Sequence, residues 1–213
     1  MLEFEQSVKS EGYRWIIGID EAGRGPLAGP VVASAVAVRH YNFESKIADS
    51  KKISPLQREK AFREIFEKSY VGVGIINETV IDDINILQAT FMAMNNAVSQ
   101  LIRSLDKEDE AHDHRTKTCL LIDGNRFKTD LPINYKTIVD GDAKVFSIAC
   151  ASIVAKVIRD RILMAYDRIY PEYGFKDHKG YGTLGHRQAI SRHGFSAIHR
   201  KSFQCNDYGN DKN

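Results

Sequence analysis

The chain has 213 residues, of which 43% are hydrophobic, and a formal net charge of +2 at neutral pH. It has no apolar run near the ~20 residues of a membrane helix and no N-terminal secretion signal, and its three cysteines are too few and too irregularly spaced for a disulfide framework. We therefore expect a folded cytoplasmic protein and exclude the secreted, membrane and disulfide-stabilised classes.

The first predicted elements are two strands and a helix. Trp15–Ile19 and Val31–Val38 are apolar runs of strand length. A helix is predicted to begin after Ser54, because Pro55 suits the first helical turn and Gln57 completes a capping box.

The middle of the chain continues with strands around one amphipathic helix. Tyr70–Ile76 is a glycine-spaced strand, and Glu78–Leu105 is predicted to be helical because its apolar residues recur every three or four positions. These apolar residues are Ile84, Leu87, Phe91, Met94, Val98 and Leu101. Asp106–Lys117 is polar and predicted to be a surface loop, and Cys119–Ile122 and Tyr135–Val139 are two further strands.

Ser147–Tyr170 is predicted to be a long helix with an apolar stripe on one side. The order of three strands with an inserted helix, then helix, strand, strand and helix, is typical of an α/β chain. The first half of its sheet is expected to be antiparallel.

Charge is unevenly distributed along the sequence. From Lys156 to Lys201 there are ten Lys or Arg residues and four Asp or Glu residues, a balance of +6 that leaves −4 for the rest. Such a basic segment predicts a surface for a polyanion, with an ordinary solvated face as the alternative. The same segment holds His178, His186, His193 and His199, which we attribute to phosphate contacts or, alternatively, to plain surface positions.

Four carboxylates end predicted strands or lie just beyond them: Asp20, Glu21, Asp123 and Asp142. Carboxylates gathered at one sheet edge would repel one another unless they were partly protonated or held a cation. An all-oxygen set of ligands favours Mg²⁺ or Mn²⁺ over zinc. For each acid alone, a role as a turn residue is the alternative.

The loop after the first strand carries Gly23, Arg24 and Gly25 directly beside the acidic pair. Glycines let backbone groups approach a ligand closely, and an arginine fork suits a phosphate. Metal-binding acids beside such a loop indicate a phosphodiester site, with a simple tight turn as the alternative.

These motifs together resemble those of bacterial ribonuclease HII, the type 2 ribonuclease H family. The string GIDEAGRGPLAGPVV is followed in order by Asp49–Lys52, Leu121–Gly124, Gly141–Lys144, Ser152–Asp160 and Lys179–Thr183. The resemblance covers residues 14–203, and Arg24 and the short segment before Arg14 distinguish the chain from the related ribonuclease HIII.

The resemblance implies a ribonuclease H-like α/β fold, a mixed five-stranded sheet flanked by helices with a small helical C-terminal region. It implies a catalytic core at 14–170, a substrate-binding region at 171–203 in the same structural unit, and tails at 1–13 and 204–213. It further implies an endoribonuclease that hydrolyses the RNA strand of RNA–DNA hybrids. This enzyme would also cut on the 5′ side of single ribonucleotides in duplex DNA, leaving 3′-hydroxyl and 5′-phosphate ends, and so remove ribonucleotides and RNA primers.

The resemblance also assigns roles to residues. Asp20, Glu21, Asp123 and Asp142 correspond to the family's catalytic carboxylates at a site for two Mg²⁺ or Mn²⁺ ions. Gly23, Arg24 and Gly25 correspond to the loop that recognises a ribose 2′-hydroxyl, and Tyr181 to a tyrosine that stacks on the following deoxyribose.

Further substrate contacts are expected from one loop and one helix. Lys51 lies in the DSKK loop and could contact the nucleic-acid backbone, with an exposed loop lysine as the alternative. Ser152, Lys156 and Asp160 are spaced by four residues on one helix face. The resemblance places that face along the substrate groove, with Asp160 near the metal site but not a ligand, and a solvated ion pair is the alternative.

The expected partners are RNA–DNA hybrid and duplex DNA with an embedded ribonucleotide, bound by a monomer. No membrane contact is expected, and no sliding-clamp peptide is evident after Phe203. Two alternatives remain: a metal-dependent DNA nuclease or resolvase of the same fold, and a non-catalytic nucleic-acid-binding module. Cleavage of a duplex with one ribonucleotide, with and without a chelator, distinguishes them.

Overall fold

The computed structural model describes residues 1–108 and 117–203. Its five-stranded sheet has the order β3-β2-β1-β4-β5. The strands are β1 (Trp15–Ala22), β2 (Val31–Val38), β3 (Ser69–Ile76), β4 (Thr118–Asp123) and β5 (Asn134–Ile138). β1, β2 and β3 pair antiparallel, whereas β1, β4 and β5 pair parallel, which confirms the mixed sheet with an antiparallel first half.

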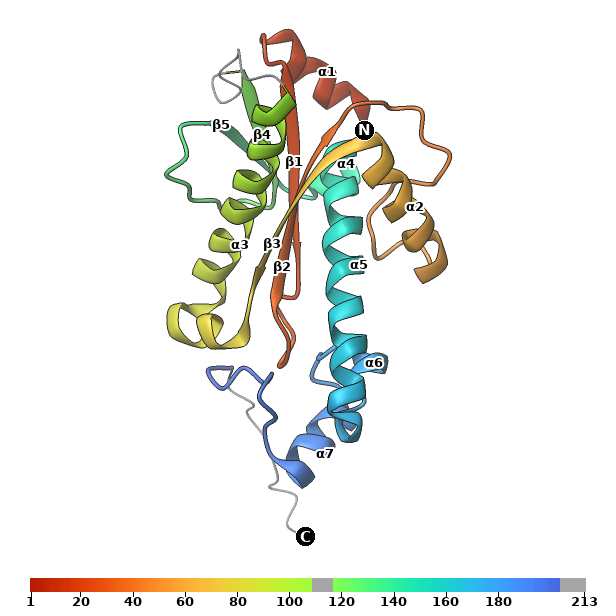
Figure 1. The fold of residues 1–213 in the computed structure, drawn as a ribbon, viewed down its shortest axis with the longest axis vertical. Coiled ribbons are helices and arrows are strands. Elements are labelled where there is room, and N and C mark those ends of the chain that lie inside the picture. Colours follow the sequence, from red (N-terminus) through yellow and green to blue (C-terminus); the bar gives the residue numbers. More distant parts are fainter. Residues whose placement is uncertain (109–116, 204–213) are drawn as a thin grey trace.

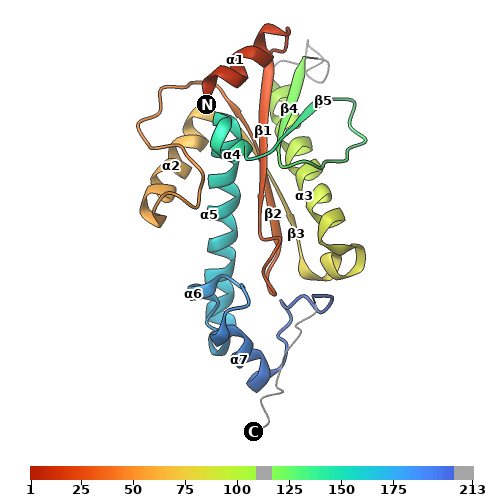
Figure 2. The same ribbon diagram turned by 180° about the vertical axis from the view of Figure 1, so that it is seen from behind.

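Helices cover both faces of this sheet (Figures 1 and 2). Helix α3 (Glu78–Glu108) lies on one face, and α2 (Pro55–Lys68) and α5 (Phe146–Ile169) lie on the other. The capping box at the start of α2 is present, because the Ser54 side chain accepts from the Gln57 backbone N–H and the Gln57 side chain accepts in return.

Helix α3 differs from the continuous helix expected from its apolar spacing. Asn85 has φ 65° and ψ 162°, which breaks the helix into two segments. Its side-chain oxygen accepts from the N–H groups of Leu87 and Gln88 and so caps the second segment. The second segment also extends to Glu108, so the expected loop Asp106–Lys117 starts with helical residues, and residues 109–116 lie outside the described part.

Helix α5 packs closely on β1, just before the end of the strand that carries Asp20. At Gly18 a Cβ atom would lie 2.2 Å from the carbonyl carbon of Ser147, so the helix rests directly on the strand backbone. On the opposite face, Met94, Val98 and Leu101 of α3 are buried in the core, as their spacing predicted. Each such side chain contributes about 1.5–3 kcal/mol when it is fully buried.

The N-terminal residues that we treated as a tail contain a helix, α1 (Leu2–Ser10). Its buried Glu5 accepts a hydrogen bond of 2.8 Å from the backbone N–H of Ser147, at the start of α5. An acidic side chain at a helix N-terminus is favourable because it meets unpaired N–H groups and the positive end of the helix dipole.

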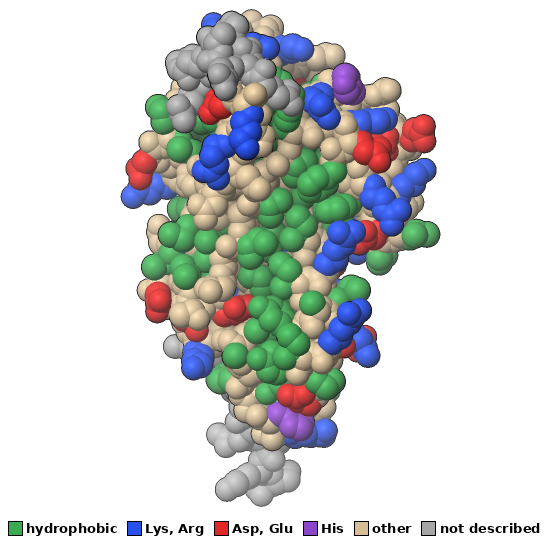
Figure 3. Space-filling view, viewed as in Figure 1, with side chains coloured by type: hydrophobic (Ala, Val, Ile, Leu, Met, Phe, Trp, Pro, Cys, Tyr) green, Lys and Arg blue, Asp and Glu red, His purple; other side chains and the backbone are tan. Residues whose placement is uncertain are grey.

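The chain after α5 is helical, as expected. It forms a short 3₁₀ turn (Pro171–Tyr173), α6 (Phe175–His178) and α7 (Leu184–His193), gathered beyond one end of the sheet in Figure 1. The same face in Figure 3 shows a band of hydrophobic side chains down its middle, with many Lys and Arg side chains over α2. In the described residues, the helices are too short or too polar to cross a membrane.

Candidate active site

Adjacent parallel strands bring the first acidic residues together. Ile19 of β1 pairs with Ile122 of β4, so Asp20 and Asp123 are the next residues on neighbouring strands. Glu21 follows Asp20 on β1. All three carboxylates line one cavity of about 320 Å³.

A backbone contact connects Asp123 to the fourth predicted carboxylate. The Gly141 N–H donates to Asp123 Oδ1 at 2.7 Å, at the start of the short helix α4 (Gly141–Lys144) that carries Asp142. Asp142 is half-buried beside this group but does not line the cavity. Burial raises the pKa of Asp142, and the charges of Asp123 and Asp49 raise it further.

Asp20 and Glu21 are also in an unfavourable environment for charge. Burial raises the pKa of Asp20 well above its usual value, and the charges of Glu21 and Asp123 add to the effect. Burial likewise raises the pKa of Glu21, against the lowering effect of Arg24, whose Nη1 lies 3.2 Å from the Glu21 carboxylate. The folded chain therefore gathers negative charge where that charge is poorly solvated.

The donor set fits a hard divalent cation, although the side chains do not form a closed coordination shell. Within residues 1–108 and 117–203, no three His, Cys, Asp or Glu side chains are grouped closely enough to hold an ion. Asp20 and Asp123 each accept from a backbone N–H, and Glu21 pairs with Arg24. Carboxylate oxygens that repel one another around a cavity suit Mg²⁺ or Mn²⁺ in chemistry.

The glycine loop after β1 forms the neighbouring wall. Gly23 has φ +101°, and a Cβ there would lie 2.1 Å from Arg159 Nε, so a side chain at this position is excluded by both conformation and contact. Gly23, Arg24 and Gly25 all line the cavity.

Two buried arginines that are not among the predicted site residues hold this loop. Arg159 of α5 donates to the carbonyls of Ala28 and Pro30 at 3.0 Å each, and to that of Lys179 at 2.9 Å. The only sequence signal for this role is that Arg159 falls beside the apolar stripe of its helix.

Arg200 holds the loop from the other side. Its guanidinium donates to the carbonyls of Gly23 at 2.6 Å and Arg24 at 3.0 Å, and to that of Gly29 at 2.9 Å and 2.7 Å. These bonds join residues far apart in sequence, so no local pattern around Arg200 indicated them.

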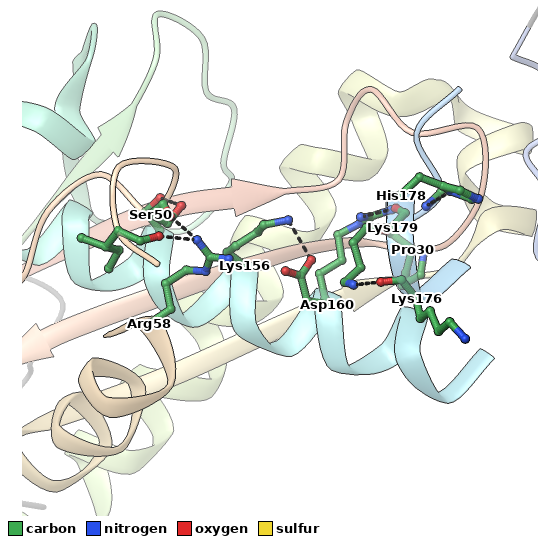
Figure 4. Close-up of polar contacts among 12 residues, drawn as sticks. Pro30, Ser50, Arg58, Lys156, Asp160, Lys176, His178 and Lys179 are labelled. Carbon is green, nitrogen blue, oxygen red and sulfur yellow. Dashed lines mark hydrogen bonds and ion pairs between the residues drawn. The ribbon is translucent and has the colours of Figure 1, made fainter. Parts of the chain in front are cut away.

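The DSKK loop and α5 supply further lining residues. The Ser152 hydroxyl lies 2.9 Å from that of Ser50 and also hydrogen-bonds the Asp20 side chain. Arg58 of α2 donates to the Ser50 carbonyl at 2.7 Å and so supports this loop, as Figure 4 shows. Lys51 lies on the cavity lining as well.

Lys156 and Asp160 form an ion pair along α5, with Nζ and Oδ1 2.7 Å apart (Figure 4). Lys156 lines the cavity, whereas Asp160 does not. Tyr181 also lines the cavity, beside the glycine loop, where its ring edge would lie 3.7 Å from a Cβ on Gly25. Of the predicted site residues, only Asp142 and Asp160 lie outside the cavity lining.

The histidines of the C-terminal region do not all lie on the surface. His186 and His199 are 0% and 2% exposed, so the expectation of phosphate contacts or surface positions is wrong for both. They pack among Tyr173 and Phe175, and only a tertiary fold that brings the two ends of this region together buries them.

Comparisons with known proteins show the family to which the chain belongs. The family model for ribonuclease HII matches residues 17–206. A ribonuclease HII of Chlorobaculum parvum is 50% identical over 199 residues, which cover 91% of each chain.

Solved structures show the same fold. A ribonuclease H2 of Pyrococcus horikoshii OT3 has a TM-score of 0.66 and 24% identity, over 89% of this chain and 94% of that one. A Bst-RNase HIII structure in complex with Mn²⁺ has a TM-score of 0.68 and 16% identity, over 90% of this chain and 68% of that one.

Proposed function

From the premise that this chain belongs to the ribonuclease HII family, we propose how its acidic cavity performs the family's reaction. The chain is an endoribonuclease that hydrolyses the RNA strand of RNA–DNA hybrids and removes ribonucleotides from DNA. The alternative of a DNA nuclease of the same fold is not favoured, because the similar curated proteins are ribonucleases HII. The observation that carries the proposal is the convergence of carboxylates, glycine loop and Tyr181 on one cavity.

Asp20, Glu21, Asp123 and Asp142 are the proposed ligands of two Mg²⁺ or Mn²⁺ ions. The chemistry that such ions supply when bound is activation of a water molecule for attack and neutralisation of charge on the leaving oxygen. The raised pKa values of Asp20, Glu21 and Asp142 support this role, because each reflects a site where a cation would relieve burial and repulsion. The Ser152 hydroxyl orients Asp20.

Substrate recognition is assigned to the sugar rather than to the base. Gly23 and Gly25 bring backbone groups to the cavity, where they can contact a ribose 2′-hydroxyl. Tyr181 is 46% exposed, and the next sugar can pack on the exposed part of its ring if that sugar lacks the hydroxyl. We assign cleavage to the 5′ side of the ribonucleotide, with 3′-hydroxyl and 5′-phosphate ends.

The cations near the cavity are assigned to the phosphates. Lys51 and Lys156 line the cavity, and Arg24 lies at its exposed rim with its guanidinium on Glu21. Asp160 holds the Lys156 ammonium in place. Two described cysteines, Cys119 and Cys150, are buried free thiols, which suits the reducing cytoplasm that we propose as the location.

End-labelled mapping tests the proposal. The substrates are four DNA duplexes, each with one ribonucleotide and differing only in its base, together with an all-DNA duplex, with and without chelator. We expect a cut on the 5′ side in all four, a 3′-hydroxyl end, and no cleavage of DNA or in chelator.

Two variants test whether the glycine loop and Tyr181 are needed for this cleavage. Gly23→Val should abolish cleavage, because the new side chain would displace Arg159 and deform the loop. Tyr181→Ala should reduce cleavage at the junction without loss of metal binding. A cyclic-phosphate end, a cut on the 3′ side or equal cutting of DNA would reject the assignment.

A further inference from the structure

Two buried histidines form one continuous hydrogen-bonded connection in the C-terminal region. The Ser196 N–H donates to His199 Nδ1 at 2.9 Å. His199 Nε2 lies 3.0 Å from His186 Nε2, and His186 Nδ1 lies 2.9 Å from the carbonyl oxygen of Tyr181. The connection therefore ends on the backbone of the residue assigned to sugar stacking.

The fixed partners at its two ends determine where the protons lie. Because the Ser196 N–H is a donor, His199 Nδ1 accepts and the ring carries its proton on Nε2. Because the Tyr181 carbonyl is an acceptor, His186 carries its proton on Nδ1. His199 Nε2–H then donates to His186 Nε2, and an additional proton on either ring would set two N–H groups against each other.

The surroundings favour this neutral state. Phe175 packs edge-on against His186 at 5.4 Å between centroids, and Tyr173 lies 5.0 Å from His199. His178 stacks on His186 at 4.3 Å. Burial lowers the pKa of His186 and of His199 to about 4.

The same segment also reaches the glycine loop. His199 forms an antiparallel bridge with Ala28, and the next residue, Arg200, donates to the carbonyls of Gly23 and Arg24. Two successive residues are thus connected to both parts of the cavity that are assigned to the sugars. The His199 ring reaches the Tyr181 backbone through His186, and the Arg200 guanidinium binds the glycine loop directly.

We propose that the neutral His186–His199 pair is a positioning device that holds Tyr181 in register with the Gly23–Gly25 loop and so sets the preference for a ribose–deoxyribose junction. The proposal rests on the proposed function, because that function is what assigns Tyr181 to packing on the deoxyribose. Neither histidine lines the cavity, so both act through the placement of another residue.

The test compares kcat/KM on two substrates, a DNA duplex with one ribonucleotide and a hybrid with a continuous RNA strand. His199→Asn keeps an acceptor for the Ser196 N–H but is too short to reach His186, and His199→Gln restores a donor near the Nε2 position. We expect His199→Asn to lower the junction-to-hybrid ratio about tenfold and His199→Gln to restore most of it.

A double variant tests whether His199 acts through Tyr181. Tyr181→Ala should lower the same ratio, and His199→Asn combined with Tyr181→Ala should lower it no further, because both changes remove one function. His40→Asn, the same substitution at an exposed histidine, is the matched control and should leave the ratio unchanged.

The outcomes separate the two proposals. If Tyr181→Ala leaves the ratio unchanged, Tyr181 does not sense the junction, and the inference fails together with that part of the proposed function. If Tyr181→Ala lowers the ratio but His199→Asn lowers both rates equally or neither, the pair is only structural and the inference alone is overturned.

A measurement on the unaltered protein covers the case in which the variants do not fold. Imidazole ¹⁵N–¹H spectra at neutral pH should show the Nε2–H form of His199 and the Nδ1–H form of His186. The same tautomer in both rings, or a charged ring, would overturn the inference.

Discussion

The acidic edge of the sheet and the wall that carries Tyr181 in the C-terminal region line the same cavity. The interactions that stabilise the two regions are of opposite kinds. At the sheet edge, Asp20 and Asp123 lie on adjacent strands, where burial and mutual repulsion oppose their charge. Behind the wall, Arg200 and, from α5, Arg159 are buried with their donors on backbone carbonyls, and His186 and His199 are neutral and bonded to each other.

The difference shows which part of the site strains the fold and which part supports it. Removal of charge from the sheet edge relieves repulsion, whereas removal of a donor from the wall leaves buried acceptors without partners. Acid also acts in opposite directions. The raised pKa of Asp20 means that acid favours the folded sheet edge, and the lowered pKa values of the histidines mean that acid opposes the folded wall.

The largest expected effect is at the sheet edge. Asp20→Asn or Asp123→Asn should reduce cleavage by several orders of magnitude while substrate binding remains, because the charge is needed for the metal. The free energy of unfolding should stay equal or rise. Single-turnover rates, binding titrations and denaturation curves measure the three quantities, and an active variant, or one inactive only because it is unfolded, would contradict the assignment.

Behind the wall, Arg200→Ala should have the opposite effect on stability. The change leaves the carbonyls of Gly23, Arg24 and Gly29 without this donor, at about 1–3 kcal/mol for each unsatisfied group. Urea denaturation should show a loss of several kcal/mol, whereas Arg192→Ala at an exposed position of α7 should change little. Equal effects of the two changes would show that Arg200 does not support the loop.

A smaller effect concerns acid. A histidine with an unfolded pKa near 6.5 and a folded pKa of about 4 takes up its proton only on unfolding in that window, so stability falls as the pH drops through it. His199→Gln should flatten this fall by up to ~1.4 kcal/mol per pH unit. His178 and Tyr173, which face the pair, are present in both proteins, so the difference in slope reports on His199. An unaltered slope would mean that His199 is not neutral in the fold.

The smallest effect concerns the basic surface. Neutralisation of Lys179, Arg187 or Lys201 should weaken binding to every duplex alike and flatten its salt dependence by up to ~0.9 per lost phosphate contact. Titrations at several salt concentrations check this prediction. If the slope is unchanged in the triple variant, these residues form only a solvated face.

Much of the fold could be predicted from local patterns, whereas the candidate site residues rest on local patterns together with the family resemblance. Apolar runs of strand length gave the strands, and the capping box at Ser54 gave the start of α2, because both signals act over a few residues. The break at Asn85 was missed, since the apolar spacing continues across it and only its φ of 65° marks the kink. Asp142 was predicted as a metal ligand and Asp160 as a neighbour of the metal site, and neither side chain lines the cavity, which depends on side-chain placement that the sequence does not show.

By itself the sequence determined the α/β order, the acids that follow buried strands and the glycine-rich loop, because neighbours along the chain dictate these features. Only the tertiary structure decided which groups support that loop. Arg200 reaches the Gly23 carbonyl across a separation of 177 residues, and His199 reaches His186 across 13. A cation or a histidine in a basic segment has the composition of a solvated surface, and its burial depends on partners that folding alone brings within hydrogen-bonding distance.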